Sequence, residues 1–180
     1  MERCRMVFSG SGGQGVITAA ILLAEAAVLH EKLTATQSQA YGAAARGGAT
    51  RSDVIISDRE ILYPKVIQPN VLVCLTQEAY NKFSSIIRPG GLLLTDERYV
   101  TLAKKVDARQ VELPMYRQVM DVIGKPIVFN ICMLGAVLGL TRLVSPESIM
   151  KVLAERLPAD FIDMNRKALE IGMQLGSGGS

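Results

Sequence analysis

The residues best suited to chemistry form one glycine-rich turn near the start of the chain: Gly10, Ser11, Gly12, Gly13, Gln14 and Gly15. An apolar run at residues 6–8 precedes this turn and a long apolar segment at residues 16–29 follows it, which predicts a strand, a turn and a buried helix. The first N–H groups of such a helix lack intrahelical partners, and the helix dipole adds positive potential there. The turn is therefore suited to a phosphate, a pyrophosphate or a partner's carboxylate.

Three of these glycines have expected roles. We expect Gly10 to adopt a positive φ, Gly12 to let a ligand approach the backbone, and Gly15 to let the first helical turn pack against the strand. The G-x-G-x-x-G spacing is that of a dinucleotide site, which also needs an acidic residue about twenty positions later. Residues 33–38 (LTATQS) contain no carboxylate, and Glu31 precedes that strand, which argues against NAD. A turn that only packs a helix on a sheet is the alternative.

A second unusual segment covers residues 38–49, SQAYGAAARGGA, which are small and uncharged except for Arg46. One interpretation is a surface loop in which Gly47 and Gly48 make a turn and Arg46 is solvated. The other is an ordered segment whose small residues admit another chain or a cofactor, while the Arg46 guanidinium gives a bidentate contact to an anion. The residues alone leave both interpretations open.

The chain offers no complete catalytic apparatus. Cys4, Cys74 and Cys132 are far apart and have no C-x-x-C spacing, so we expect neither a disulfide framework nor an iron–sulfur or zinc site. His30 is the single histidine and lies just past an apolar helix, so we expect neither a Ser-His-Asp triad nor a histidine metal site. The helix dipole favours His30 there as a C-terminal residue.

The composition predicts one soluble domain without nucleic-acid or membrane partners. The 180 residues are 49% hydrophobic and 21% charged, and the formal net charge is only +3. No run of Lys and Arg indicates a nucleic-acid surface. Residues 1–5 lack the apolar core of a signal peptide, and no apolar run is as long as a membrane span. A cytoplasmic location is therefore expected.

Strand and helix signals alternate along most of the chain. Residues 50–57 and 60–63 predict a hairpin around a turn at Asp58, and residues 71–75, 92–95 and 109–113 predict further strands. Helices are expected at residues 77–87, 115–123, 127–140, 146–156 and 159–175, with Gly176 ending the last one. This order predicts a three-layer α/β/α Rossmann-like domain with a largely parallel sheet and a helical C-terminal part. We expect a single domain over residues 1–175 and a flexible tail over residues 176–180.

Several motifs together resemble the gamma subunit of 2-oxoacid:ferredoxin oxidoreductases. They are GSGGQGV at residues 10–16, SQAYG at residues 38–42 and RGG at residues 46–48. Further matches are ISD at residues 56–58 with Ile61, YP at 63–64, QEAY at 77–80, Asn130 with Gly135, and Asn165 with Ala168 and Gly172. The sequence departs from the family pattern at two places: it has Ala43-Ala44 in place of a frequent Pro-Glu, and Asn70 in place of an Asp.

The resemblance implies a non-catalytic subunit that closes the active site and helps to bind coenzyme A (CoA) through the glycine turn and Arg46, Gly47 and Gly48. Alpha, beta and delta (ferredoxin-like) subunits would carry thiamine diphosphate and iron–sulfur clusters, and ferredoxin would accept the electrons. The RGG segment and the short length resemble the 2-oxoglutarate branch more than the pyruvate branch. The alternatives are an indolepyruvate or branched-chain 2-oxoacid enzyme, or a stand-alone nucleotide-binding or regulatory module.

A docking subunit should also expose small and apolar residues. We expect such a surface at residues 40–45 and on the helix that contains Gly135 and Gly139, with tight internal packing of that helix as the alternative. When its partners are missing, the isolated chain is expected to self-associate, or residues 38–49 to lose order.

Overall fold

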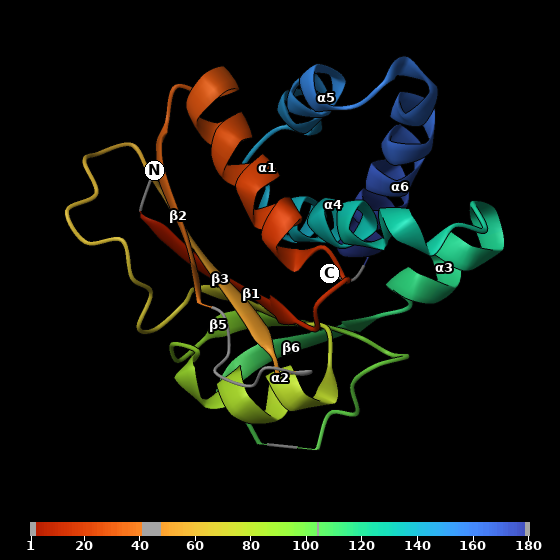
Figure 1. Cartoon of the computed structure of the whole chain (residues 1–180). Coiled ribbons are helices and arrows are strands. Elements are labelled where there is room, and N and C mark those ends of the chain that lie inside the picture. The colour runs from red at the N-terminus through yellow and green to blue at the C-terminus, as the bar shows by residue number, and fades with distance from the viewer. Residues whose placement is uncertain (1–2, 41–47, 104, 179–180) are drawn as a thin grey trace.

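The computed structural model describes residues 3–40, 48–103 and 105–178, and these form a single twisted sheet with helices on both faces (Figure 1). The strands are β1 (Cys4–Gly10), β2 (Thr34–Ala40), β3 (Thr50–Ser57), β4 (Val71–Cys74), β5 (Gly91–Asp96) and β6 (Ala108–Leu113). Their order in the sheet is β2-β3-β1-β4-β5-β6. Strands β1, β4, β5 and β6 pair in parallel, whereas β3 is antiparallel to both β1 and β2. The largely parallel α/β sheet is therefore confirmed.

The two faces of the sheet are covered unequally (Figure 1). The helices are α1 (Val16–His30), α2 (Gln77–Phe83), α3 (Met115–Val122), α4 (Phe129–Thr141), α5 (Pro146–Arg156) and α6 (Ala159–Gly178), with short 3₁₀ turns η1 (Ser84–Ile86) and η2 (Pro126–Val128). Among the helices of the described residues, α2 and η1 alone cover one face, where Tyr80 and Phe83 join the smaller core. Helices α1 and α3 to α6 cover the other face, where α1 and α4 are buried in the larger core.

Helix caps predicted from the sequence are present. The Thr76 hydroxyl oxygen accepts from the Ala79 N–H at the start of α2, and the Ser145 hydroxyl accepts from the Ser148 N–H at the start of α5. Glu31, just past α1, also accepts from the backbone N–H of Ser145 and the hydroxyl of Ser148. These hydrogen bonds lower the pKa of the Glu31 carboxyl. They join the C-terminal end of α1 to the N-terminal end of α5.

The predicted return strand at residues 60–63 is wrong. These residues have no strand hydrogen bonds, because β3 already pairs with β1 along one edge and with β2 along the other. Residues 58–70 instead form a loop from β3 to β4, which we call the 58–70 loop. It extends beside the N-terminal end of the chain in Figure 1.

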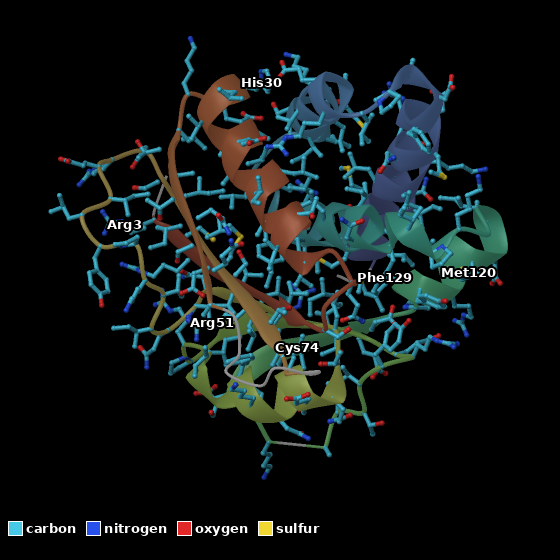
Figure 2. The ribbon with its side chains drawn as sticks, viewed as in Figure 1. Arg3, His30, Arg51, Cys74, Met120 and Phe129 are labelled. Atoms are coloured by element: carbon cyan, nitrogen blue, oxygen red, sulfur yellow. The ribbon has the colours of Figure 1, made fainter. Side chains whose placement is uncertain are left out.

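The 58–70 loop is fixed at its middle by a partly buried ion pair on β3. Arg51 Nε lies 2.6 Å from Asp53 Oδ1, and Asp53 Oδ2 accepts from the Val66 N–H at 3.0 Å. The Arg51 guanidinium also donates to the Val66 carbonyl oxygen at 2.5 Å and lies 5.6 Å from the centre of the Phe83 ring. Figure 2 labels Arg51 on the sheet. Because Asp53 is only 7% exposed, this pair is well shielded from water.

Replacing Asp53 with alanine should therefore release the loop and lower the free energy of unfolding by about 2 kcal/mol, since the Arg51 charge loses its partner and the Val66 N–H loses its acceptor. Urea denaturation measures the loss of stability, and the rate of proteolytic cleavage within residues 58–70 measures the release of the loop. Glu60→Gln, on the exposed part of the same loop, is the matched control. Unchanged stability and cleavage in Asp53→Ala would contradict an anchoring role.

Helices α4 and α6 pack backbone to backbone. A Cβ added at Gly135 would lie 3.0 Å from the Leu169 carbonyl carbon, and one added at Gly139 would lie 2.6 Å from the Met173 carbonyl oxygen. Gly172 and Gly176 on α6 face Cys132 and Ala136 on α4 in the same way. The expectation that the Gly135–Gly139 face is an exposed docking surface is wrong, because α6 covers it. The alternative, tight internal packing, is confirmed.

The last helix is longer than predicted. Gly176 does not end α6, because it is a buried contact residue, and the helix continues to Gly178. Residues 176–178 of the expected flexible tail are therefore helical, and residues 179–180 lie outside the described part of the chain. Within the described ranges, none of the helices combines the length and the apolar character that a membrane crossing requires.

Candidate functional site

The glycine turn connects the carboxyl end of β1 with the start of α1, and Gln14 fixes its shape. The Gln14 side chain accepts from the Ser11 N–H at 2.8 Å and donates to the Leu75 carbonyl oxygen at 3.0 Å. It thereby ties the turn to the end of β4. A Cβ on Gly10 would approach Gln14 Oε1 to 2.5 Å, so a larger residue there would displace the Gln14 side chain that shapes the turn. The expected positive φ at Gly10 is wrong, since this residue belongs to β1.

The positive φ angles fall on Gly13, at 89°, and Gly15, at 72°. Gly15 is the N-cap residue of α1, and its left-handed conformation favours glycine. A Cβ on Gly15 would lie 2.6 Å from Asn130 Nδ2, and the Asn130 amide donates to the Gly15 carbonyl oxygen at 3.3 Å. The expectation that Gly15 lets the first helical turn pack against the strand stays a prediction, although Val16 Cγ1 in that turn would lie 3.1 Å from a Cβ on Gly10 at the end of β1. The close neighbour of Gly15 is the first turn of α4.

The start of α1 is open to an anion. No side chain caps this N-terminus in the described part of the chain, and its first turn contains no acidic residue. Gly12 and Gly13 are exposed, and a Cβ on either would have no neighbour within 4 Å. The free N–H groups and the helix dipole thus face accessible space, which is the arrangement that binds phosphates at helix N-termini.

A cavity of about 730 Å³ opens beside the turn, between the ends of α1, α4, α5 and α6. Its walls are mostly apolar and include Gly13, Leu22, Phe129, Leu153 and Phe161, with the amides of Asn130 and Asn165 among the polar groups. Figure 2 labels Phe129, the first residue of α4. Cavities of this volume and lining accommodate organic ligands or cofactors. One signal of this cavity is visible in the sequence, because both asparagines belong to the family motifs quoted above.

Sequence reasoning missed the groups that shape one wall of the cavity. The rings of Tyr99, Tyr116 and Phe129 pack together with centroids 5.5 to 5.9 Å apart. Buried Asp96, at the carboxyl end of β5, accepts from the backbone N–H groups of Tyr116 at 2.8 Å and Arg98 at 2.9 Å. Burial raises the pKa of the Asp96 carboxyl, and these hydrogen bonds oppose that shift. Asp96 is a structural carboxyl that holds the aromatic wall in place.

Comparison with known proteins decides the family. The family model for pyruvate ferredoxin/flavodoxin oxidoreductase matches residues 5–175, nearly the whole chain. The chain belongs to this family. A 2-oxoglutarate synthase subunit, KorC, from Methanocaldococcus jannaschii is 44% identical over 169 residues, which are 93% of this chain and 90% of that subunit. The resemblance found in the sequence motifs is thereby confirmed.

Solved structures agree with the family fold. The gamma subunit of a keto/oxoacid ferredoxin oxidoreductase from Geobacter sulfurreducens has a TM-score of 0.90 and 38% identity, with 99% of each chain covered. A 2-oxoglutarate:ferredoxin oxidoreductase from Magnetococcus marinus, solved with 2-oxoglutarate, coenzyme A and succinyl-CoA bound, has a TM-score of 0.89 at 19% identity. The match covers all of this chain and 32% of that longer chain, and it shows the shared fold alone.

The residues that follow the second family segment lie beside the glycine turn. Arg46 and Gly47 lie outside the described residues, and Gly48 is partly buried just before β3. The Ala49 N–H donates to Glu78 Oε1 at 3.3 Å, and the Thr50 hydroxyl donates to the Gly10 carbonyl oxygen at 3.1 Å. The chain that leaves the RGG motif is therefore fixed beside the first residue of the glycine turn.

The cysteines of this family member are packing residues. Cys74 and Cys132 are buried, and burial raises the pKa of each thiol to about 12. Cys4 is partly buried, with its pKa raised to about 11 for the same reason. Such thiols stay protonated near neutral pH, unlike reactive or metal-binding cysteines. The described residues contain no cluster of three or more His, Cys, Asp or Glu side chains that could hold a metal ion.

His30 is the last residue of α1, as predicted.

Proposed function

We propose that this chain is the gamma subunit of a multi-subunit 2-oxoacid:ferredoxin oxidoreductase that converts 2-oxoglutarate to succinyl-CoA. The observation that carries the proposal is the 44% identity with a 2-oxoglutarate synthase subunit over 93% of this chain. The match to a gamma subunit over 99% of both chains supports the same assignment. A cytoplasmic location is part of this proposal.

Companion subunits would supply the redox chemistry. In this proposal alpha, beta and delta subunits hold thiamine diphosphate and the iron–sulfur clusters, and ferredoxin accepts the electrons. Two of the three cysteines of this chain are buried, all have raised thiol pKa values, and they lie on three different elements, β1, β4 and α4. They are therefore poor cluster ligands, which is consistent with a subunit that contributes binding surface rather than electron transfer.

The glycine turn would contribute to a CoA site at the subunit interface. Its free N–H groups, the dipole of α1 and the accessible backbone at Gly12 and Gly13 fit a phosphate group. Gln14 shapes the turn, which Gly10, Ser11 and Gly15 complete. The segment that precedes Thr50 contains Arg46, Gly47 and Gly48, and the Arg46 guanidinium would add a cationic contact to the same phosphate. Bound CoA would supply the thiol that receives the succinyl group.

The isolated chain should be inactive. With 2-oxoglutarate, CoA, ferredoxin and added thiamine diphosphate, we expect no ferredoxin reduction by this chain alone, because it would hold neither the thiamine diphosphate nor a redox centre. The complex purified with its companion subunits should contain thiamine diphosphate and iron, and should turn over 2-oxoglutarate in preference to pyruvate and branched-chain 2-oxoacids. Turnover by the isolated chain would overturn the subunit assignment. A preference for another 2-oxoacid would overturn only the substrate.

A further inference from the structure

The 58–70 loop presents large apolar side chains to solvent. Leu62 is 82% exposed, Ile67 is 72% exposed and Tyr63 is 58% exposed. These are three of only eight large apolar side chains exposed in the described residues, and they lie within six positions of one another. Scattered exposed apolar residues are ordinary, whereas a group on one segment indicates an interaction site.

The loop that carries them is held in place at several points. Arg3 donates to the Glu60 carbonyl oxygen at 2.8 Å, and the Asn70 N–H donates to the Arg5 carbonyl oxygen at 2.7 Å. Between these points the Arg51–Asp53 pair fixes Val66, which is 3% exposed. Two prolines in the loop further restrict its backbone. A partner would therefore meet a largely preorganised surface, which reduces the entropy lost on docking.

The charges of the loop point to a protein partner. Its ionisable residues, Asp58, Arg59, Glu60 and Lys65, are all exposed and carry two charges of each sign. A nucleic acid or an anionic membrane surface is bound by an excess of positive charge. Apolar and aromatic side chains surrounded by mixed charges are typical of protein–protein interfaces.

From these contacts we infer that the 58–70 loop docks into an apolar recess of a companion subunit, with Leu62, Tyr63 and Ile67 as the buried anchors. This inference rests on the proposed function. The fold of this chain recurs as 32% of a longer chain in the Magnetococcus oxidoreductase, so such a unit can be a permanent neighbour of further domains. In the proposed complex the companion would be a different chain, and a non-covalent contact would have to hold it.

The docking loop is separate from the proposed CoA site. The two ends of the loop are bonded to Arg3 and Arg5 near the start of β1, and its middle is bonded to Asp53, which pairs with Val7 at the centre of that strand. The glycine turn follows the end of β1 and is bonded to none of these loop residues by the hydrogen bonds of Gln14. Changes to the loop can therefore weaken assembly without altering the groups that would bind CoA.

The test compares two double variants in the assembled enzyme. Leu62→Ser with Ile67→Ser removes two anchors of the loop. Leu29→Ser with Val122→Ser is the matched control, because it removes two other exposed apolar side chains, on α1 and α3. The affinity of each purified chain for the companion subunits is measured by surface plasmon resonance. Complex formation is measured by co-elution of the chain with thiamine diphosphate and iron. We expect the loop variant to bind about a hundredfold more weakly and the control to bind like the wild type.

The assembly and the stability of the loop variant together decide whether the loop binds a companion subunit. A loop variant that keeps the wild-type melting temperature but loses the companion supports the inference. A folded loop variant that assembles like the wild type overturns it and leaves the proposed function intact. Loss of self-association by the isolated chain, with assembly unchanged, would assign the loop to a second copy and also overturn it. If the wild-type chain itself fails to bind companion subunits, the proposed function fails as well.

Discussion

Replacing Gly172 with alanine is expected to lower the free energy of unfolding by about 3 kcal/mol, the upper end of the usual cost of overpacking. The added Cβ would overlap the Cys132 carbonyl oxygen and lie 2.8 Å from both the Cys132 carbonyl carbon and the Ala136 nitrogen. These are backbone atoms of α4, so no side-chain rotation can relieve the overlap and the two helices must separate. The gain in helix propensity from alanine, about 1 kcal/mol, offsets only part of this cost.

Gly178→Ala is the matched control for this prediction, because it lies on the same helix and its added Cβ would have no neighbour within 4 Å. We expect the control to be as stable as the wild type or slightly more stable. For a chain of 180 residues, a loss of about 3 kcal/mol lowers the melting temperature by roughly 6–12 °C. Thermal and urea unfolding followed by circular dichroism measure both variants. Equal stability of Gly172→Ala and the wild type would contradict the close contact of α4 and α6.

The regular elements were predicted well from the sequence because their signals are local. Apolar runs marked β4 and β5, and the caps at Thr76 and Ser145 marked the starts of α2 and α5. The position of β3 in the sheet was not predictable in this way. Its apolar residues show that it is buried, but they do not show which strands flank it. The turn-forming Asp58 therefore suggested a hairpin that the pairing with β1 and β2 excludes.

The same limit applies to the glycines of the last two helices. The four-residue spacing of Gly135 and Gly139 predicted a close contact, but the residues that fill it, Leu169 and Met173, each lie 34 positions later in the chain. Gly176 has an ordinary local interpretation as a helix end. Only the position of α4 against it shows that Gly176 is a packing residue within α6.

At the candidate site, the motif spacing predicted the turn but not the role of each glycine. The conformation depends on Gln14, which bonds to the end of β4, and on Asn130, which is 115 residues away from Gly15 in the sequence. Such contacts have no local signature. With these contacts, the left-handed conformation occurs at Gly13 and Gly15 and not at Gly10 as expected. Gly10 instead has a steric role beside Gln14. The aromatic wall around Asp96 was missed for the same reason.

The second large effect is expected from Arg46→Ala in the assembled enzyme. We predict a ten- to hundredfold higher apparent KM for CoA, with the apparent KM for 2-oxoglutarate nearly unchanged. Arg46 precedes Thr50 by four residues, and Thr50 is bonded to Gly10 at the start of the glycine turn. A guanidinium from this segment would complement the N–H groups of α1 around one phosphate. Loss of a charge-assisted contact of this kind costs about 1.5–3 kcal/mol, which corresponds to the predicted range.

Assembly must be measured first, because Arg46 could instead bind a carboxylate of a companion subunit. Arg166→Ala, an exposed cation on α6, is the matched control for the change in charge, and it should leave both KM values unaltered. A complex of Arg46→Ala that forms normally and keeps the wild-type CoA dependence would exclude Arg46 as a CoA ligand. A complex that fails to form would assign Arg46 to the subunit interface. If instead only the apparent KM for CoA rises, and that KM depends less on salt than in the wild type because the screened charge contact has been removed, the glycine turn and the RGG segment bind the same anion.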